Sequence, residues 1–261
     1  MENTVLITGG TSGIGLELAK LFAADQYQLV LVARNQEKLM QTANMLQREY
    51  NVKVTTIAKD LFNPESGFEL YQEVKEKGIE VNVLVNDAGQ GLYGQFIESD
   101  IRRQLDIIQL NISSLVVITH QFLQDMVAKG SGKILNLSSI AGKIPGPWQA
   151  VYHGTKAFVQ SFTEAIRSEV KDAGITVTAL LPGATDTDFF NKAEMTQSKI
   201  VQENNLDDAA KVAKDGYDAL NNGEDMVVSG LKNKMQVAMN ALTSDETAAD
   251  RMGKMQEPAK G

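Results

Sequence analysis

Tyr152 and Lys156 stand four residues apart in a stretch of helical pattern that begins near Gln149, and Ser139 lies shortly upstream. This spacing places the phenol and the ammonium on one face of a helix, within reach of one small ligand. A cation so close favours the phenolate, so we expect Lys156 to lower the phenol pKa from about 10 toward neutrality. Such a tyrosine donates and accepts a proton, as the interconversion of a carbonyl and an alcohol requires. Because both residue types are common, the pair is informative only if the chain also binds a hydride carrier.

The elements that would position these side chains are short β-branched runs alternating with longer amphipathic segments. Several runs are apolar nearly throughout, which is typical of strands buried on both faces of a parallel sheet. The expected strands are 4–8, 28–33, 52–57, 81–85, 133–137, 175–181 and 226–229. The expected helices are 14–24, 36–50, 65–77, 100–126 and 149–172. The alternation predicts an α/β fold with a parallel sheet, helices on both faces and right-handed crossovers.

A glycine-rich turn, Thr8-Gly9-Gly10-Thr11-Ser12-Gly13-Ile14-Gly15, joins the first expected strand to the first expected helix. Glycines at such a junction let backbone N–H groups and the positive helix N-terminus approach a pyrophosphate. The alternative is a turn that is merely flexible, but three spaced glycines in the first βαβ unit favour a dinucleotide site. Leu16 follows where a phosphate-binding loop needs lysine, which argues against a nucleotide triphosphatase.

Arg34 ends the second expected strand, where an NAD site usually carries an acidic residue for the ribose 2′-hydroxyl. A guanidinium matches a 2′-phosphate in charge and in its fork geometry. The position therefore favours NADP(H) over NAD(H). The alternative is an exposed arginine that opens a helix, where a positive charge is slightly unfavourable.

Six elements, in this order along the chain, resemble the short-chain dehydrogenase/reductase family over roughly residues 3–190, with the shorter-chain branch the closer fit. They are Thr8-Gly9-x-x-x-Gly13-x-Gly15, Asn86-Asp87-Ala88-Gly89, Asn111, Ser139, Tyr152-x-x-x-Lys156 and Pro182-Gly183. Segments 29–34, 91–94 and 183–190 also look like a bacterial group of oxidoreductases labelled as related to D-alanine transfer operons. That label names no substrate.

The resemblance implies a Rossmann-like, doubly wound sheet of about seven strands in a three-layer α/β/α domain, and a role for each site residue. Tyr152 would exchange the proton, Ser139 would orient the carbonyl oxygen, and Lys156 would hold the nicotinamide ribose. Asn111 would kink its long helix and hold a water that links Lys156 to solvent. The further cofactor contacts implied are Gly9, Thr11, Ser12, Gly13, Ile14, Gly15, Arg34, Asn35, Asp60, Leu61, Asn86, Ala88, Gly89, Pro182, Gly183, Thr185 and Thr187.

The chain departs from this family at Asp87, where a second asparagine is usual. The change exchanges an N–H donor for a carboxyl group beside the cofactor. We expect it to affect the sheet more than the chemistry. His153 points about 100° away from Tyr152 on a helix, so we expect it to pack rather than to react, and we expect the same of His120. Ser139 lacks the GxSxG context of a hydrolase nucleophile.

Bulk composition bounds the class of protein. The 261 residues, 43% hydrophobic and 22% charged, predict one globular domain over 1–261. A net charge of −8 and a pI near 4.9 argue against nucleic-acid binding. With no cysteine and two histidines, the chain offers almost no ligands for a zinc site. It shows neither a signal peptide nor an apolar run long enough for a membrane span, so we expect a cytoplasmic protein.

Two segments break the α/β rhythm. The polar segment 185–205 is expected to be a substrate lid, and the alternative is an ordinary surface loop. The segment 231–261 is expected to be a variable tail whose four methionines are core or tail residues rather than a binding groove. Segments 87–94, 140–150 and 185–205 should form the substrate mouth. Its apolar lining is expected from Tyr93, Ile144, Trp148, Phe189 and Phe190.

These features favour an NADP(H)-dependent carbonyl reductase or alcohol dehydrogenase acting on a small molecule. A protein that binds or senses a dinucleotide without turnover is one alternative. An isomerase or dehydratase with tightly bound cofactor is another. The two long helical segments predict a homodimer or homotetramer, with a monomer as the alternative if the methionine-rich tail folds back.

Overall fold

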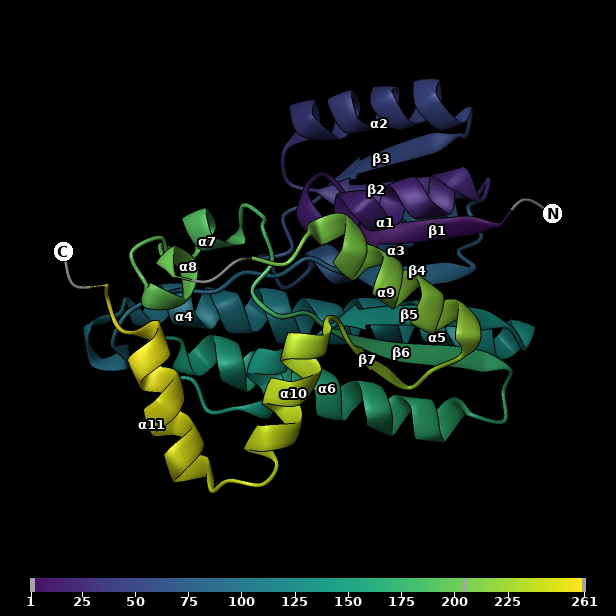
Figure 1. Ribbon diagram of the computed structural model, residues 1–261. Coiled ribbons are helices and arrows are strands. Elements are labelled where there is room, and N and C mark those ends of the chain that lie inside the picture. The colour runs from purple at the N-terminus through teal and green to yellow at the C-terminus, as the bar shows by residue number, and fades with distance from the viewer. Residues whose placement is uncertain (1–2, 204–205, 260–261) are drawn as a thin grey trace.

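The computed structural model describes residues 3–203 and 206–259, and within them a wholly parallel seven-stranded sheet forms the centre (Figure 1). The strand order is β3-β2-β1-β4-β5-β6-β7. The strands are β1 Thr4–Thr8, β2 Gln28–Ala33, β3 Val54–Ala58, β4 Val83–Asn86, β5 Gly132–Leu137, β6 Ile175–Leu181 and β7 Met226–Val228. The predicted fold class, a doubly wound Rossmann-like sheet, is confirmed.

Helices cover both faces of the sheet. On one face lie α1 Gly13–Ala24, α2 Gln36–Tyr50 and α9 Ala209–Asn222, and on the other lie α3 Ser66–Glu76, α5 Leu115–Lys129 and α6 Ala150–Val170. Successive strand residues belong to the hydrophobic cores on opposite faces of the sheet. Val5 shares one core with Phe22 of α1, whereas Leu6 shares the other with Phe122 of α5. This double burial explains why the strands are apolar nearly throughout.

The long segment expected as one helix over 100–126 is helical but not uniform. It consists of α4 Ile101–Ile108, a π-helical stretch η2 Gln109–Ser114, and α5. A π-helical turn widens the hydrogen-bond ladder locally and is frequent at functional sites. Asn111 lies in this stretch, so the regular helix is interrupted where the kink is expected.

The order of the strands reverses between β1 and β4, which leaves a crevice at the carboxyl ends of the strands. Short elements gather beyond this edge in Figure 1. They are η1 Phe96–Glu98, η3 Ile140–Lys143, α7 Phe189–Lys192, α8 Lys199–Gln202, α10 Leu231–Asn240 and α11 Asp245–Gln256. The segment expected as a tail over 231–261 thus forms two helices, with residues 260–261 outside the described part of the chain.

Helix α11 is fastened to the body of the protein near α6. The Gln256 side-chain amide lies 3.1 Å from Nε2 of His153 and 3.4 Å from Oε1 of Gln149. The Tyr93 hydroxyl donates to the Gln256 carbonyl at 2.5 Å. Beyond α11, a β-bridge joins Pro258 to Ser198, just before α8. The C-terminal helices therefore close over the same edge of the sheet as the crevice.

Candidate active site

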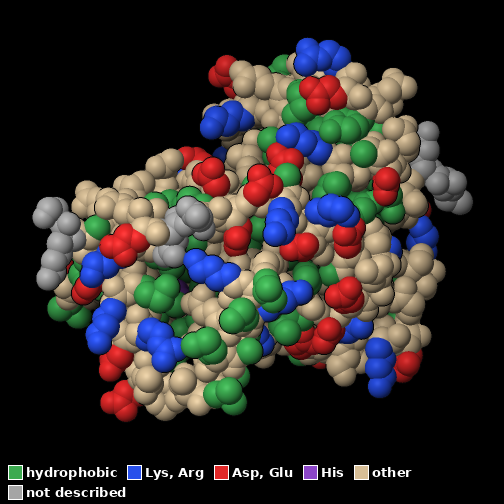
Figure 2. All heavy atoms as spheres, in the orientation of Figure 1, with side chains coloured by type: hydrophobic (Ala, Val, Ile, Leu, Met, Phe, Trp, Pro, Cys, Tyr) green, Lys and Arg blue, Asp and Glu red, His purple; other side chains and the backbone are tan. Residues whose placement is uncertain are grey.

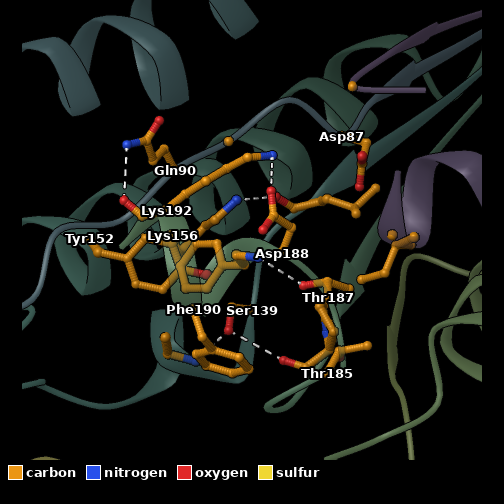
Figure 3. Close-up of a pocket in the computed structure, with 18 of the residues that line it drawn as sticks. Asp87, Gln90, Ser139, Tyr152, Lys156, Thr185, Thr187, Asp188, Phe190 and Lys192 are labelled. Carbon is orange, nitrogen blue, oxygen red and sulfur yellow. Dashed lines mark hydrogen bonds and ion pairs between the residues drawn. The ribbon is translucent and has the colours of Figure 1, made fainter. Parts of the chain in front are cut away.

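A cavity of about 510 Å³ occupies the crevice, and Figure 3 shows Ser139, Tyr152 and Lys156 around it with residues of the β6–α7 segment. Three of the four side chains proposed to carry chemistry thus line one space. The fourth, Asn111, is buried behind the lining. The sequence spacing is sufficient to bring the first three together because β5 ends and α6 begins at this edge.

Tyr152 and Lys156 lie one helical turn apart on α6. The Lys156 Nζ atom is 5.8 Å from the centroid of the Tyr152 ring and donates a hydrogen bond of 2.8 Å to the Leu137 carbonyl. Ser139 follows β5, where its Oγ donates to the Pro182 carbonyl at 3.2 Å and accepts from the Ala141 N–H at 3.1 Å. These backbone contacts fix the hydroxyl at the cavity wall.

The expected lowering of the Tyr152 pKa is wrong for this structure. Desolvation in the cavity raises the pKa of the phenol to about 12, and a hydrogen bond with Ser139 opposes this only in part. The Lys156 ammonium lies beside the ring face and bonds the Leu137 carbonyl, so it does not govern the phenol. Tyr152 is therefore a neutral phenol at physiological pH, and a proton donor.

Lys156 and Asp87 form an electrostatic pair under the cavity floor. Burial lowers the pKa of Lys156 to about 8, and the charge of Asp87 opposes the shift. Burial raises the pKa of Asp87 to about 7, against the influence of Lys156 and of a hydrogen bond from the Gly15 N–H. Both groups therefore change charge near neutral pH.

Asp87 lies against the glycine-rich turn rather than in the sheet. A Cβ atom on Gly9 would come within 2.8 Å of the Asp87 Oδ2 atom. The carboxyl group also lines the cavity. The Asp87 side chain thus lies between the pyrophosphate end of the cleft and Lys156, and its expected effect on the sheet more than on the chemistry stays a prediction.

Asn111 holds the segment after β4 in place. Its Nδ2 donates to the Gln90 carbonyl at 2.9 Å and to the Thr155 hydroxyl at 3.0 Å, and its Oδ1 accepts from the Gln90 N–H at 3.0 Å. A Cβ atom on Gly89 would lie 3.4 Å from both Asn111 Oδ1 and Lys156 Nζ. Both polar groups thus flank Gly89. The water relay through Asn111 stays a prediction.

The glycine-rich turn has the conformation and the free donors that a pyrophosphate needs. Gly9 and Gly13 adopt φ angles of +78° and +55°, which side chains rarely tolerate. Ser12 at the N-cap of α1 makes no capping hydrogen bond through its side chain, so among the first N–H groups of the helix those of Gly13 and Ile14 are left for an anion, whereas the Gly15 N–H donates to Asp87. The turn therefore fits the phosphates of a dinucleotide.

Most of the residues expected to contact the cofactor line the cavity. They are Gly9, Thr11, Ser12, Gly13, Ile14, Arg34, Asn35, Leu61, Ala88, Gly89, Tyr152, Lys156, Pro182, Gly183, Thr185 and Thr187. Gly15, Asp60 and Asn86 do not reach the lining. Asn86 instead ties the sheet together, since its Nδ2 donates to Asn136 at 2.8 Å and to Thr119 at 3.0 Å.

Cations gather where the adenosine end of a dinucleotide would lie. The Arg34 guanidinium lies 4.8 Å above the centroid of the Phe62 ring, and Lys38 and Lys59 line the same part of the cavity. Lys59 is held by Glu69 at 3.1 Å. The sequence pattern singles out Arg34 alone, although Lys38 follows it at an i,i+4 spacing that would have indicated a second cation.

The expected apolar mouth is formed by only part of the expected set. The Phe189 ring lies 5.1 Å from that of Tyr152, and Phe190 is buried beside it. Tyr93 and Trp148 stack on each other at 5.5 Å and do not line the cavity. Ile144 lines a second cavity next to the first.

His153 has the packing role expected of it. Its Nδ1 lies 2.7 Å from the Ile144 carbonyl, and burial lowers its pKa, so the ring is neutral. Two buried glutamines that the sequence does not indicate lie around it. Gln149 and Gln256 both line the cavity, and each keeps one side-chain atom, Nε2 and Oε1 respectively, without a partner.

The segment expected as a lid crosses the glycine-rich turn. A Cβ atom on Gly13 would come within 2.9 Å of the Thr187 methyl carbon. Helices α7 and α8 follow, and residues 204–205 at the end of the segment lie outside the described residues. The segment thus roofs the cavity, whereas movement of a lid stays a prediction.

The part of the chain that comprises residues 3–203 and 206–259 holds no group of three or more histidine and acidic side chains arranged to bind a metal ion. None of its helices combines the length and apolar character that crossing a bilayer requires.

Residues 3–198 match the sequence model of the short chain dehydrogenase family. Sulfoacetaldehyde reductase 2 of Chromohalobacter salexigens is 37% identical over 191 residues, which cover 72% of this chain and 75% of that protein. Very-long-chain 3-oxoacyl-CoA reductase of Rattus norvegicus is 35% identical over 186 residues, 68% of this chain, and the match spans only 57% of that protein.

Among solved structures, a short-chain dehydrogenase from Sphingobium yanoikuyae in complex with NADPH superposes with a TM-score of 0.82 at 28% identity. The superposition covers 93% of this chain and 95% of that chain. The likeness therefore extends beyond residue 198 into the C-terminal part. The narrower resemblance to the operon-related group stays a prediction.

Proposed function

The chain belongs to the short-chain dehydrogenase family, and from this premise we propose that it is an NADP(H)-dependent oxidoreductase that interconverts a carbonyl group and an alcohol. The observation that carries the proposal is the convergence of Ser139, Tyr152 and Lys156 on one cavity that continues to a glycine-rich turn with free N–H donors. The structure from Sphingobium yanoikuyae, which contains NADPH, supports the choice of cofactor class.

The cofactor would lie along the crevice with its pyrophosphate at the turn before α1. Arg34, Lys38 and Lys59 would hold the 2′-phosphate, because three cations line that part of the cavity. Pro182, Gly183, Thr185 and Thr187 would flank the nicotinamide. When bound, the dinucleotide supplies a hydride to the carbonyl carbon or accepts one from the alcohol.

Tyr152 serves as the acid in carbonyl reduction. With a pKa raised to about 12 by burial, the phenol is protonated at neutral pH. An alkoxide is a stronger base than a phenolate, so the proton passes to the nascent alcohol oxygen as that oxygen gains charge. The raised pKa thus favours the reductive direction.

Ser139 would orient the carbonyl oxygen, and Lys156 would hold the nicotinamide ribose. The Ser139 Oγ already accepts the Ala141 N–H, so its own proton is directed either to Pro182 or to a substrate oxygen. Because the pKa of Lys156 is about 8, its ammonium group can release a proton into the site close to neutral pH. Asn111 would hold a water that connects Lys156 to solvent.

The segment 185–205 is proposed as a lid over this site, in a single domain that spans residues 1–261. Thr187 lies on the glycine-rich turn and Phe189 lies against Tyr152. A movement of this segment would therefore open the cofactor end and the substrate end together.

The test is the oxidation of NADPH by purified protein supplied with a panel of ketones and aldehydes. We expect turnover by the native chain and a loss of at least a hundredfold in Tyr152→Phe, since general acid catalysis contributes about 10² to 10⁴ in rate. Tyr71→Phe is the matched control, because Tyr71 lies on α3 and bonds Asp125. Turnover that survives in Tyr152→Phe would contradict the mechanism. Cofactor binding with no oxidation of NADPH on any substrate would indicate a protein that binds the dinucleotide without turnover.

A further inference from the structure

A second cavity of about 510 Å³ lies between the two C-terminal helices, and we call it the α10–α11 groove. Its full lining is Ile144, Leu231, Lys232, Met235, Gln236, Met239, Asn240, Ala248, Arg251, Met252 and Met255. Most of these side chains are apolar, and four of them are the methionines that the sequence pattern assigns to core or tail. All of these residues except Ile144 lie outside residues 3–198, which match the family model.

One wall of the groove is an exposed apolar stripe. Leu231, Met235 and Met239 follow each other at i,i+4 spacing on α10 and are 75%, 58% and 55% exposed. Hydrophobic side chains gather over α10 on the face shown in Figure 2. Apolar surface in water costs about 25 cal/mol per Å², and exposed apolar patches of this kind commonly mark binding sites. The stripe therefore needs an apolar occupant.

The groove adjoins the candidate active site. Lys232, Gln236, Met252 and Met255 line both cavities, so the two spaces share part of their walls. Methionine is unbranched and flexible, so Met252 and Met255 can turn aside at low cost. A hydrocarbon chain attached to a carbonyl at Tyr152 would enter the groove past these shared side chains.

The charges at the groove restrict the end group of such a chain. Lys232 and Arg251 belong to its lining, and no acidic side chain does. A neutral or anionic end group is compatible with these two cations. A cationic end group is not.

We propose that the α10–α11 groove holds the hydrocarbon chain of the substrate, so that the enzyme acts on carbonyl compounds, or the matching alcohols, that carry a long unbranched apolar chain. The inference rests on the proposed function, because it takes the reacting carbonyl to lie at Tyr152.

The kinetic test is the reduction of 2-alkanones from 2-butanone to 2-dodecanone with NADPH. Each buried CH₂ contributes about 0.8 kcal/mol, so kcat/KM should rise roughly three- to fourfold per added carbon and flatten once the groove is full. Reduction of 2-butanone with no rise along the series would overturn the groove proposal and leave the proposed function intact. No reduction of any 2-alkanone or aldehyde would count against both.

A pair of variants tests whether the dependence of kcat/KM on chain length arises in the groove. Met235→Glu places a carboxylate in the groove, whereas Leu242→Glu changes a residue that is 89% exposed and lines neither cavity. The ratio of kcat/KM for 2-dodecanone to that for 2-butanone should fall at least tenfold in Met235→Glu and stay unchanged in Leu242→Glu. Equal ratios in the two variants would overturn the proposal.

A binding measurement tests the groove without turnover. By calorimetry, dodecanoate should bind the native protein, bind Met235→Glu at least tenfold more weakly, and bind better than dodecylammonium. A second copy of this chain could occupy the groove instead of substrate. Light scattering on both variants gives their masses and tests this alternative. If Met235→Glu alone dissociates an oligomer, the groove is a subunit interface and the proposal fails.

Discussion

At the scale of single residues, the site is governed by where charge is buried. Arg34 acts at the rim of the cleft, where its guanidinium is exposed and lies over Phe62. Asp87 acts beneath the glycine-rich turn, where its carboxyl group is desolvated and opposed by Lys156. One residue is therefore expected to set the choice of cofactor, and the other to make the folded state sensitive to pH.

Arg34→Ser should reduce the preference for NADPH over NADH by about ten- to a hundredfold. The reason is that hydrogen bonds to charged groups contribute about 1.5–3 kcal/mol each, and only NADPH carries the 2′-phosphate. Dissociation constants for both cofactors from nucleotide fluorescence titration give the ratio. Arg48→Ser is the control, because Arg48 lies at the opposite end of α2 from the cavity. An equal affinity of the native protein for NADPH and NADH would remove the role assigned to Arg34.

Asp87→Asn should stabilise the protein at pH 8 and have little effect near pH 4. The folded pKa of about 7 lies above the ordinary 3.8, so the folded state holds this proton more tightly than the unfolded state. Stability contributed by this carboxyl is therefore lost as pH rises from 3.8 to about 7, and the loss is complete above that range. About 3 pKa units correspond to up to about 4 kcal/mol.

The measurement for Asp87 is urea unfolding of the native chain and Asp87→Asn at several pH values. The difference in free energy of unfolding between the two proteins should grow from pH 4 to pH 7 and then level off. A difference that does not change with pH would show that the carboxyl group titrates in the folded state as it does in the unfolded chain.

At the scale of elements, the predictability of the chain depends on what each element packs against. Strands β1 to β7 and helices α1, α2, α3 and α6 are indicated by the sequence within a few residues, because they bury apolar faces against one sheet, whereas α4 and α5 are expected as one helix. In α10 the stripe of Leu231, Met235 and Met239 faces a groove instead, so apolar spacing alone does not place the helix. The interruption by η2 inside the long helix is expected from Asn111 only through the family resemblance.

The same contrast holds for the candidate site. Ser139, Tyr152 and Lys156 are found from the sequence because they lie close together in the chain, on two consecutive elements. Gln149 and Gln256 meet across 107 positions, and only the docking of α11 brings them together. No local pattern signals such a contact, because its formation depends on tertiary packing.

Gln256→Leu should loosen α11 without unfolding the domain. The substitution removes the amide that contacts His153 and Gln149, and it leaves the polar atoms of these two side chains without that partner. An unpaired buried polar group costs about 1–3 kcal/mol of stability. We expect trypsin to cut at Arg251 and Lys254 several times faster than in the native chain, with the urea midpoint of the sheet domain nearly unchanged. Gln72→Leu on α3 is the control, since Gln72 is exposed and bonds only Glu76. Unchanged proteolysis would mean that the remaining contacts hold α11 without this amide, namely the apolar contacts of Met252, the Tyr93 bond to the Gln256 carbonyl and the bridge between Ser198 and Pro258.

At the scale of the whole molecule, two of the exposed apolar surfaces among the described residues lie on different elements. One is the α10 wall of the groove, which we assign to substrate. The other lies on α4 and α6, which contact each other and carry Ile101, Leu105 and Phe158 with exposed fractions of 56%, 56% and 40%. Paired helices with an exposed apolar face fit an isologous contact between two copies of the chain. We therefore propose a homodimer built by α4 and α6, as the long helical segments predict.

Leu105→Glu should convert this dimer to a monomer. In a two-fold contact each substitution occurs twice, and the two carboxylates would be buried close to each other without partners, which costs several kcal/mol. Light scattering after size exclusion, at a concentration where the native chain is dimeric, gives the mass. Leu242→Glu is the matched control, because Leu242 is also an exposed leucine but follows α10. A native chain that is monomeric at high concentration, or a dimer that dissociates in Leu242→Glu and persists in Leu105→Glu, would place the contact elsewhere. In the latter case the segment that follows α10 would carry the contact, and the dimer at α4 and α6 would be wrong.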